Sequence, residues 1–546
     1  MDSKENDYFS HLPDTLLFVI VSFLPFKEAV RTSVLARRWR NIWYAAKNIE
    51  FDEKFFVKNE ESDENKAMQR MSFVSFIKHW MDNCVETDLH SFRLVFSHSE
   101  HHLSQIQDCI RFCVDRDVKA LDLNFSDPTW NEDDLEQIPE TFLELSSYDS
   151  LKKLESLKLS ACNFRVFQFV TFSTLKNVYL GWIEFPGSCF KNLMSMCPSL
   201  ETLNLKRCWN MENFYIDSEK LRVFVIDKCL GPEVIILNAP FLSFFQYSGP
   251  SVQLQIEYHP RMVEVILDFG LQTESNEEGE GDMLYNLLTE ISSVRVLTIC
   301  SYMLQYELTH FLCFLVDFLK LIVTADDPIT LKPALENVKH LILKTELHIN
   351  EFYGITFFLK NCPNLEILTI DLCTRTIFQD YKPPFTFEEH QFLTRFQCLR
   401  YRSTMCLKMV NVKGFKGETN ELIVLSYLLR FGSALKYLSI GLSKEKGPNG
   451  IDMESTYRQN AEMAEPLPPI LMAGPPSAEN QRPRMSQLRL RLQQAEYLRA
   501  WIFAQRTSFC PQCYDNYEKE WTKLVAIEKT FLETDRKLID HLCLCG

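Results

Sequence analysis

The chain has 546 residues, of which 46% are hydrophobic and 24% are charged, and its formal net charge is −15. This length exceeds the roughly 250–300 residues at which a single hydrophobic core stops growing, so we expect several domains or an elongated repeat array. The apolar content excludes a wholly disordered chain, and the negative charge argues against nucleic acid or an anionic membrane as the partner.

Eighteen cysteines are scattered along the chain, many of them inside apolar runs. This distribution is typical of reduced, buried thiols rather than of the disulfide framework of a small secreted domain. No apolar run reaches the ~18–20 residues needed to cross a bilayer. We therefore expect a protein of the cytoplasm, the nucleus or both, without a membrane partner.

The first predicted element is a helix that starts at Pro13 and Asp14, because proline fits the first helical turn and an acid there complements the helix dipole. Four apolar residues fall on one stripe of this helix at the spacing i, i+4, i+7 and i+8, namely Leu16, Ile20, Phe23 and Leu24. Further apolar residues flank the stripe, namely Leu17, Phe18 and Val21. The helix is thus apolar nearly all round and needs cover on more than one side.

The apolar run from Leu16 to Leu24 could also be the core of a secretory signal peptide or a membrane anchor. It has only about half the length of a bilayer span. Asp2, Glu5 and Asp7 outnumber Lys4 at the start of the chain, and no small-residue cleavage site follows the run. A helix that docks on another protein is the better interpretation.

Pro25 ends the first helix, and the stretch from Phe26 to Trp43 predicts a second one. This stretch has an excess of positive charge, since it contains one acid, Glu28, and five basic residues, namely Lys27, Arg31, Arg37, Arg38 and Arg40. Two short helices cannot enclose so many large apolar side chains by themselves. We therefore expect the surplus apolar surface to bind a partner, and an acidic one.

The stretch "LPDTLLFVIVSFLPFKEAVRTSVLARRWRNIW" resembles the F-box of plant F-box proteins, through its "LPD" opening, its "SFLP…KEAVRTSVL" middle and its "RRWRNIW" close. The resemblance implies a small helical domain over residues 7–53 that binds the Skp-type adaptor of a cullin–RING ubiquitin ligase. The implied adaptor contacts are Leu12, Pro13, Leu16, Ile20, Leu24, Val34, Leu35 and Trp39, with Trp43 packed behind them. The alternative is that these residues only fill a local core.

A short pattern of spaced apolar residues recurs beyond the F-box-like stretch: apolar, two residues, apolar, one residue, apolar. Its ten copies are Val118-Leu121-Leu123, Leu154-Leu157-Leu159, Leu175-Val178-Leu180, Leu200-Leu203-Leu205, Leu221-Phe224-Ile226, Leu242-Phe245-Tyr247, Val294-Leu297-Ile299, Val338-Leu341-Leu343, Leu365-Leu368-Ile370 and Leu435-Leu438-Ile440. From the second to the sixth copy the steps are 21, 25, 21 and 21 residues, which lie within the range of leucine-rich repeats. The step of 52 residues from Leu242 to Val294 corresponds to about two units.

The pattern predicts an α/β fold in which irregular leucine-rich repeats, over residues 110–400, stack into a solenoid. The last two apolar residues of each copy point inward along a short strand, while the residues between them face outward. Outward residues are therefore candidates for target contact, namely Glu155, Ser156, Lys158, Glu201, Thr202, Asn204, Glu366 and Thr369. The acidic run Thr273–Asp282 predicts a loop inserted between repeats.

Several copies carry a cysteine three residues after the pattern, namely Cys162, Cys208, Cys229 and Cys373. Leucine-rich repeats accept Asn or Cys there, because a small buried donor can bond to the turn backbone. Metal ligation is the alternative, but these cysteines lie about one repeat apart rather than at the two- to three-residue spacing of metal knuckles. We therefore expect structural thiols.

Residues 401–446 predict a strand, a glycine-containing turn, an amphipathic helix and another strand. Through "KGFKGETNELIVLSYLLR" and "LKYLSI" this segment resembles the FBD module that follows leucine-rich repeats in many plant F-box proteins. The resemblance to the F-box/LRR/FBD family thus extends over three modules in one order.

Residues 447–484 are rich in proline and predict a linker, and residues 485–546 form a charged, helical tail without an assignment. The tail holds five potential zinc ligands, namely Cys510, Cys513, His541, Cys543 and Cys545. Cys510 and Cys513 have knuckle spacing, but the other three alternate by two residues near the chain end, where ordering is weak. Ordinary thiols are the favoured interpretation over a metal site.

The sequence contains neither a phosphate-binding glycine loop nor a nucleophile elbow nor an H-E-x-x-H motif. We therefore expect no catalysis and no cofactor in this chain. The family resemblance implies the substrate-recognition subunit of an SCF-type (Skp adaptor, cullin, F-box) ubiquitin ligase, with an unidentified protein target. Two alternatives stay open, a non-proteolytic F-box scaffold and a metal-binding module in the tail.

Overall fold

The computed structural model describes residues 12–58, 61–84, 89–98, 100–132, 134, 151, 153–163, 172–250, 252–257, 260–270, 287–305, 335–372, 406–416, 418, 420–421, 424–425, 428 and 434–442. The chain divides into two compact units, Met1–Arg261 and Met262–Gly546, which are described separately. No described helix is both long enough and apolar enough to span a membrane.

The first unit begins with two short α-helices, α1 (Asp14–Ser22) and α2 (Phe26–Thr32), followed by 3₁₀ turns η2 (Arg37–Trp39) and η3 (Ile42–Ala45). The expected second helix is therefore shorter than predicted, because it stops at Thr32 instead of continuing to Trp43. The Thr32 hydroxyl donates to the Ala29 carbonyl at 2.7 Å, and Ala36 is fully extended at φ −161°. Side-chain bonding of this kind competes with helix continuation.

Helix α2 packs on an aromatic cluster that the next elements provide, strand β1 (Asn48–Asp52) and helix α3 (Asp63–Asn83), while α1 contacts η3. The Phe26 ring lies 5.3 Å from the Phe51 ring, 5.8 Å from that of Trp80 and 6.0 Å from that of Trp43, measured between centroids. Edge-on contacts of this type add to the stabilisation from apolar burial. Helix α3 was not predicted, because its apolar residues do not gather on one face, and only Phe73, Ile77 and Trp80 are buried.

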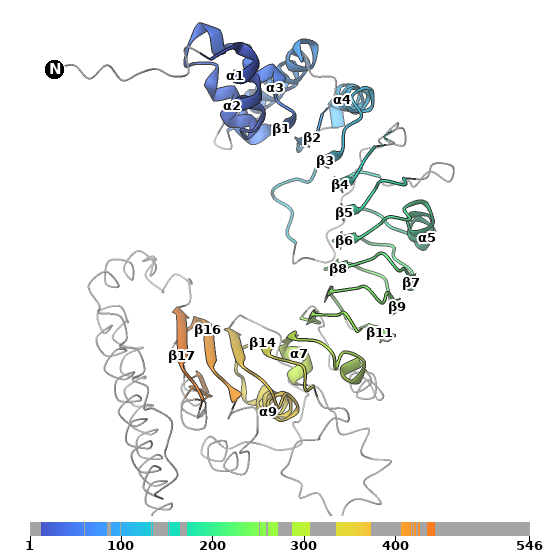
Figure 1. Cartoon of the computed structure of the whole chain (residues 1–546), viewed down its shortest axis with the longest axis vertical. Coiled ribbons are helices and arrows are strands. Elements are labelled where there is room, and N and C mark those ends of the chain that lie inside the picture. Colours follow the sequence, from blue (N-terminus) through green and yellow to red (C-terminus); the bar gives the residue numbers. More distant parts are fainter. Residues whose placement is uncertain are drawn as a thin grey trace, which may run out of the picture. The chain divides into compact units, whose positions relative to one another are not determined.

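Parallel strands follow one another along one side of the first unit (Figure 1). After β1 they are β2 (Ser91–Val95), β3 (Ala120–Asn124), β4 (Ser156–Ser160), β5 (Asn177–Gly181), β6 (Thr202–Lys206), β8 (Val223–Asp227) and β10 (Phe244–Ser248). Neighbouring strands pair in register, so that equivalent repeat positions lie side by side. This inner sheet has a buried aliphatic face and an accessible face.

The opposite side of the first unit carries helices and a second, three-stranded parallel sheet (Figure 1). Its elements are η4 (Glu53–Phe55), η5 (Glu100–His102), α4 (Leu103–Asp115), α5 (Gly187–Met196), β7 (Phe214–Asp217), β9 (Val234–Asn238) and β11 (Gln253–Ile256). Helix α4 buries Ile106, Ile110 and Cys113, which share one helical face. The sequence pattern did not predict the strands of this second sheet.

The second unit repeats the arrangement with parallel strands β12 (Glu264–Asp268), β13 (Val296–Cys300), β14 (His340–Thr345), β15 (Ile367–Leu372), β16 (Met409–Phe415) and β17 (Tyr437–Leu442). Its other elements are α7 (Ser301–Leu304), η7 (Ile349–Glu351) and α9 (Phe352–Asn361). Gly414 lies inside β16 rather than in the turn after it, at φ +73° and at a register irregularity. A Cβ there would come within 2.3 Å of the Leu372 carbonyl oxygen, so only glycine fits.

All ten predicted copies of the apolar pattern coincide with parallel strands, which confirms the repeat interpretation. Three further copies were overlooked, Leu89-Phe92-Leu94, Met262-Val265-Leu267 and Leu407-Val410-Val412, and they coincide with β2, β12 and β16. Strand β12 supplies the unit that the 52-residue step predicted. In the first unit the strand array therefore starts at β1, inside the residues assigned to the F-box, and in the second unit it runs from β12 to β17.

The repeat cysteines bond to backbone, as predicted. The Cys229 thiol donates to the Leu205 carbonyl at 3.4 Å and accepts from the Cys208 amide at 3.3 Å, and the Cys208 thiol donates to the Leu180 carbonyl at 3.6 Å. Burial raises the pKa of Cys208 well above its usual value, so this thiol stays protonated. Cys162 is likewise fully buried, whereas Cys373 lies outside the described residues.

A buried carboxyl in the second unit makes its stability sensitive to pH. Glu351 is 0% exposed, accepts from the His348 amide at 2.7 Å, and its pKa is raised from 4.5 to about 7, chiefly by burial. The folded state thus holds this proton more tightly than the unfolded state. Its contribution is complete below about pH 4.5 and is lost as the pH rises through about 7, by ~3 kcal/mol in all.

We expect Glu351→Gln to flatten this dependence, because glutamine keeps an amide oxygen for the His348 bond and cannot ionise. Urea unfolding followed by circular dichroism at about pH 5 and pH 8 measures the difference. The native protein should lose more unfolding free energy between these values than the variant does. Equal losses would contradict the assignment of this pH dependence to Glu351.

Candidate functional site

Helix α1 has one covered face and one open face. Leu17 and Val21 are 0% exposed and point into the unit, whereas Leu16, Val19 and Phe23 are 48%, 51% and 81% exposed. The exposed residues follow the spacing i, i+3 and i+7, so they share one side of the helix. A folded chain rarely leaves such a row of large apolar side chains uncovered, which marks this side as a contact surface.

The turn after α2 extends the apolar surface. Val34 is 84% exposed and Leu35 is 67% exposed, although the backbone around them is ordered by bonds from the Val34 amide to the Arg31 carbonyl and from the Leu35 amide to the Thr32 carbonyl. A fixed turn that presents two aliphatic side chains to solvent is suited to insertion into an apolar groove of a partner. We call Leu16, Val19, Phe23, Val34 and Leu35 the docking surface.

Arginine side chains stabilise and border this docking surface. Arg38 forms an ion pair with Asp14 at 2.6 Å and also donates to the Leu12 carbonyl, so it ties the start of α1 to the turn η2. Arg31 pairs with Glu28 at 2.6 Å on α2. Arg37 and Arg40 are exposed. The predicted excess of basic charge therefore lies beside the apolar side chains and favours an acidic partner.

The structure places the predicted adaptor contacts at different depths. Pro13, Leu16, Val34 and Leu35 are exposed, and Leu12, Ile20 and Leu24 are half-buried. Trp39 is only 9% exposed and Trp43 only 7%, so the chain itself covers both indoles. The family resemblance placed Trp43 behind the adaptor contacts, and its indole stacks on Phe76 of α3 with 5.9 Å between ring centroids. Trp39, which the resemblance placed among the direct contacts, presents little of its indole to a partner.

Three exposed apolar residues were missing from the predicted contact set, Phe18, Val19 and Phe23, at 37%, 51% and 81% exposure. A signal for Phe23 was present, since it falls on the same helical stripe as Leu16 and Ile20. For Phe18 and Val19 the sequence pattern held no such signal, because the covered side of α1 depends on where η3 packs against it.

The accessible face of the inner sheet in the first unit carries a ladder of alternating charge. Glu50, Arg93, Asp122 and Lys158 occupy equivalent positions on four neighbouring strands. Arg93 pairs with Glu50 at 2.8 Å and with Asp122 at 3.3 Å, and Lys158 pairs with Asp122 at 3.6 Å. Burial raises the pKa of Asp122 and outweighs the opposing effect of Lys158 and Arg93. The ladder is largely neutralised within the chain.

Some of the other residues that the repeat pattern predicted to face outward form ion pairs or hydrogen bonds within the chain. Glu201 pairs with Arg222 at 3.6 Å, and Glu366 pairs with Lys408 at 2.6 Å. Thr369 is only 3% exposed, and its hydroxyl lies 2.9 Å from His340 Nε2. Glu155 is exposed, while Ser156, Thr202 and Asn204 are half-buried on the accessible face.

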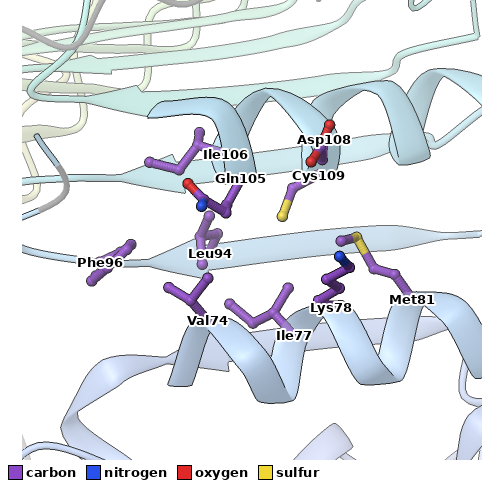
Figure 2. Close-up of a pocket in the computed structure, with 10 residues that line it drawn as sticks. All are labelled: Val74, Ile77, Lys78, Met81, Leu94, Phe96, Gln105, Ile106, Asp108 and Cys109. Atoms are coloured by element: carbon purple, nitrogen blue, oxygen red, sulfur yellow. The ribbon is translucent and has the colours of Figure 1, made fainter. Parts of the chain in front are cut away.

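A crevice lies between α3 and α4 above β2, and its walls are mainly apolar (Figure 2). Its charged residues are Lys78 and Asp108, of which Asp108 pairs with Arg111 at 2.6 Å. Burial raises the pKa of Cys109 to about 12, so this thiol is protonated at neutral pH. The crevice therefore offers no activated nucleophile.

Within the part of the chain that the structure describes, no group of His, Cys, Asp and Glu residues could hold a metal ion. The five potential zinc ligands of the tail, Cys510, Cys513, His541, Cys543 and Cys545, lie outside the described residues. The linker over 447–484 and the acidic run Thr273–Asp282 lie outside them as well. The described cysteines carry thiols and form no disulfide with one another.

Two family profiles match the chain. The F-box domain profile matches residues 9–48, which contain α1, α2 and both 3₁₀ turns. The profile described as "At1g61320/AtMIF1, LRR domain" matches residues 80–459, which contain the strands from β2 to β17. The two matches agree with the order of the modules that the sequence predicted.

Curated relatives are similar to the chain over most of its length. The "Putative F-box/LRR-repeat protein At1g56400" of Arabidopsis thaliana is 32% identical over 79% of this chain and 87% of its own length. The "Putative F-box protein At3g29830" of the same plant is 32% identical over 81% and 93%, respectively. The "F-box/FBD/LRR-repeat protein At1g78750" of that plant is 26% identical over 81% and 91%. The chain therefore belongs to the F-box/LRR-repeat protein family.

Proposed function

We propose that the chain is the substrate-recognition subunit of an SCF-type ubiquitin ligase. Its F-box and leucine-rich-repeat domains fit such a receptor role. In this role the docking surface binds the Skp-type adaptor and, through it, the cullin–RING ligase. The observation that carries the proposal is the open side of α1, where Phe23 stays 81% exposed while Leu17 and Val21 are fully buried.

The adaptor contacts that we propose divide by depth. Leu16, Val34 and Leu35 insert directly, because their side chains are exposed. Leu12, Ile20 and Leu24 contribute smaller areas because their side chains are half-buried, and Pro13 contributes an exposed ring. Trp39 acts indirectly by supporting the turn that carries Val34 and Leu35, since little of its indole is accessible. Basic side chains around the surface favour fast association with an acidic adaptor.

The mechanism that we propose is tethering. The docking surface holds the adaptor, and the accessible faces of the inner sheets hold a protein target. The effective concentration of target lysines near the charged ubiquitin-conjugating enzyme then rises without any bond-making by this chain. Other subunits perform the chemistry, and the chain requires no cofactor. A cytoplasmic or nuclear location suits this role.

Leu12→Ala combined with Pro13→Ala is expected to abolish capture of a purified Skp-type adaptor in a pull-down. Pro13 sets the start of α1, since its carbonyl accepts from the Leu16 amide at 3.0 Å, and Leu12 adjoins the open side. Circular dichroism of the variant should match that of the native protein, because both residues lie outside the repeats. Undiminished capture by the double variant would contradict the proposed adaptor role.

A further inference from the structure

Five residues form a row along one edge of the inner sheet in the second unit. Each stands directly before the first residue of a strand, from β13 to β17. The five residues are Arg295, Lys339, Glu366, Lys408 and Lys436. Four backbone hydrogen bonds of 2.8 Å join them in sequence order. In each bond the amide of one residue donates to the carbonyl of the residue before it in the row. They therefore occupy equivalent positions on five neighbouring strands. At the usual strand spacing the row is roughly 19 Å long.

The row carries an excess of positive charge at the surface. Its four basic side chains are exposed, and Glu366 is its single acid. Glu366 is shared between Lys408 at 2.6 Å and Lys339 at 3.4 Å, and hydrogen bonds from these two lysines lower its pKa. Arg295 and Lys436, at the two ends, form no ion pair with a described residue. We call the five residues the basic row.

The basic row contrasts with the chain as a whole, whose formal net charge is −15. A long polyanion such as nucleic acid would meet this overall repulsion along most of its length. A short acidic peptide would engage the row alone and gain its local attraction. The charge distribution therefore favours a compact acidic ligand over a nucleic acid.

The strand positions next to the basic row suit contact with a peptide. Tyr437, which follows Lys436, is 63% exposed and offers a ring and a hydroxyl. His340, which follows Lys339, lies with Nε2 2.9 Å from the Thr369 hydroxyl, and Asn411 donates to the same hydroxyl at 3.5 Å. Side chains of this kind can bond to peptide backbone beside a charged contact.

We infer that the basic row is a docking site for an acidic segment of a protein target, rich in aspartate or glutamate. Carboxylates of an extended segment reach Arg295 and Lys436 at the ends and compete with Glu366 for Lys339 and Lys408. The segment crosses the strands, and roughly six extended residues cover the row. The inference rests on the proposed receptor function and specifies the chemistry of its target.

The test uses the full chain and a fluorescein-labelled decapeptide of alternating glutamate and serine, with fluorescence anisotropy as the readout. The peptide should bind at least about fivefold more tightly than a twin with glutamine in place of glutamate. Arg295→Glu combined with Lys436→Glu should weaken binding by roughly tenfold, because two attractive contacts become repulsive. The difference should shrink at ~0.5 M salt, where surface charges are screened.

A matched control is Lys191→Glu combined with Lys220→Glu, which makes the same change of charge at exposed positions of the first unit that are not part of the basic row. This control should bind the acidic peptide like the native chain. Three outcomes overturn the inference: equal weakening by the control, equal affinity for the glutamine twin, or equally tight binding of a ten-nucleotide oligothymidylate. Adaptor capture on the same preparations separates the two claims, since intact capture with failed peptide binding removes only this inference.

Discussion

Phe23→Asp combined with Val34→Asp is expected to reduce adaptor binding by more than about a hundredfold, the largest functional effect that we predict. Phe23 is 81% exposed and Val34 is 84% exposed, so neither side chain supports the core of its own unit. In the complex both would enter an apolar groove, where an unpaired carboxylate is strongly unfavourable. Isothermal titration calorimetry with a purified Skp-type adaptor measures the change.

A control with the same chemistry is available elsewhere in the chain. Tyr215, 58% exposed on β7, and Val263, 45% exposed before β12, lie outside the docking surface. Tyr215→Asp combined with Val263→Asp should leave adaptor affinity unchanged. If this control weakened binding as much as the docking-surface variant, the effect would reflect general charge or misfolding rather than a local contact. If neither variant weakened binding, the docking surface would be misassigned.

Trp80→Ala is expected to lower the free energy of unfolding of the first unit by about 3–5 kcal/mol, the largest effect on stability that we predict. Trp80 is 0% exposed, and its ring centroid lies 5.8 Å from Phe26, 5.6 Å from Phe51 and 5.7 Å from Phe112. It therefore joins the F-box helices to the first repeats. Urea unfolding followed by far-ultraviolet circular dichroism measures the loss.

Trp80→Phe tests how much of this loss comes from the aromatic ring contacts, because it keeps a ring that Trp80→Ala removes. The Trp80 indole N–H is buried and has no hydrogen-bond partner among the described residues, so its removal costs no bond. Phenylalanine keeps an aromatic ring in the cluster, and the expected loss is less than half of that for alanine. Equal losses for the two variants would show that the ring contacts around Trp80 contribute little.

The sequence predicted most of the repeat architecture because the signal is local and repeated. Each strand places its aliphatic residues on one side of the chain with a period of two, and each copy of the pattern reports this independently. The overlooked β7, β9 and β11 show the limit of that signal. They lie between successive copies of the apolar pattern and form a second sheet, so the residues of that pattern do not report them.

The candidate site was only partly predictable. The F-box resemblance located it between Leu12 and Trp43, and Leu16, Val34 and Leu35 are indeed exposed. The resemblance did not indicate that Trp39 is nearly covered by the chain itself. The basic row could not be predicted from the sequence either. Arg295 and Lys436 are more than a hundred residues apart, and they share one sheet edge only because five strands pair.

By itself the sequence determined that the chain carries an F-box-like helical segment, a parallel array of short strands and a surplus of apolar surface near its start. These features depend on local periodicity, proline positions and turn residues, which act over a few positions. Only the tertiary structure decided which part of that surplus is open to a partner. The reason is physical: Leu17 and Val21 of α1 are buried because the chain folds back onto that helix through η3, whereas Phe26 of α2 is covered by Phe51 and Trp80 only once β1 and α3 have formed.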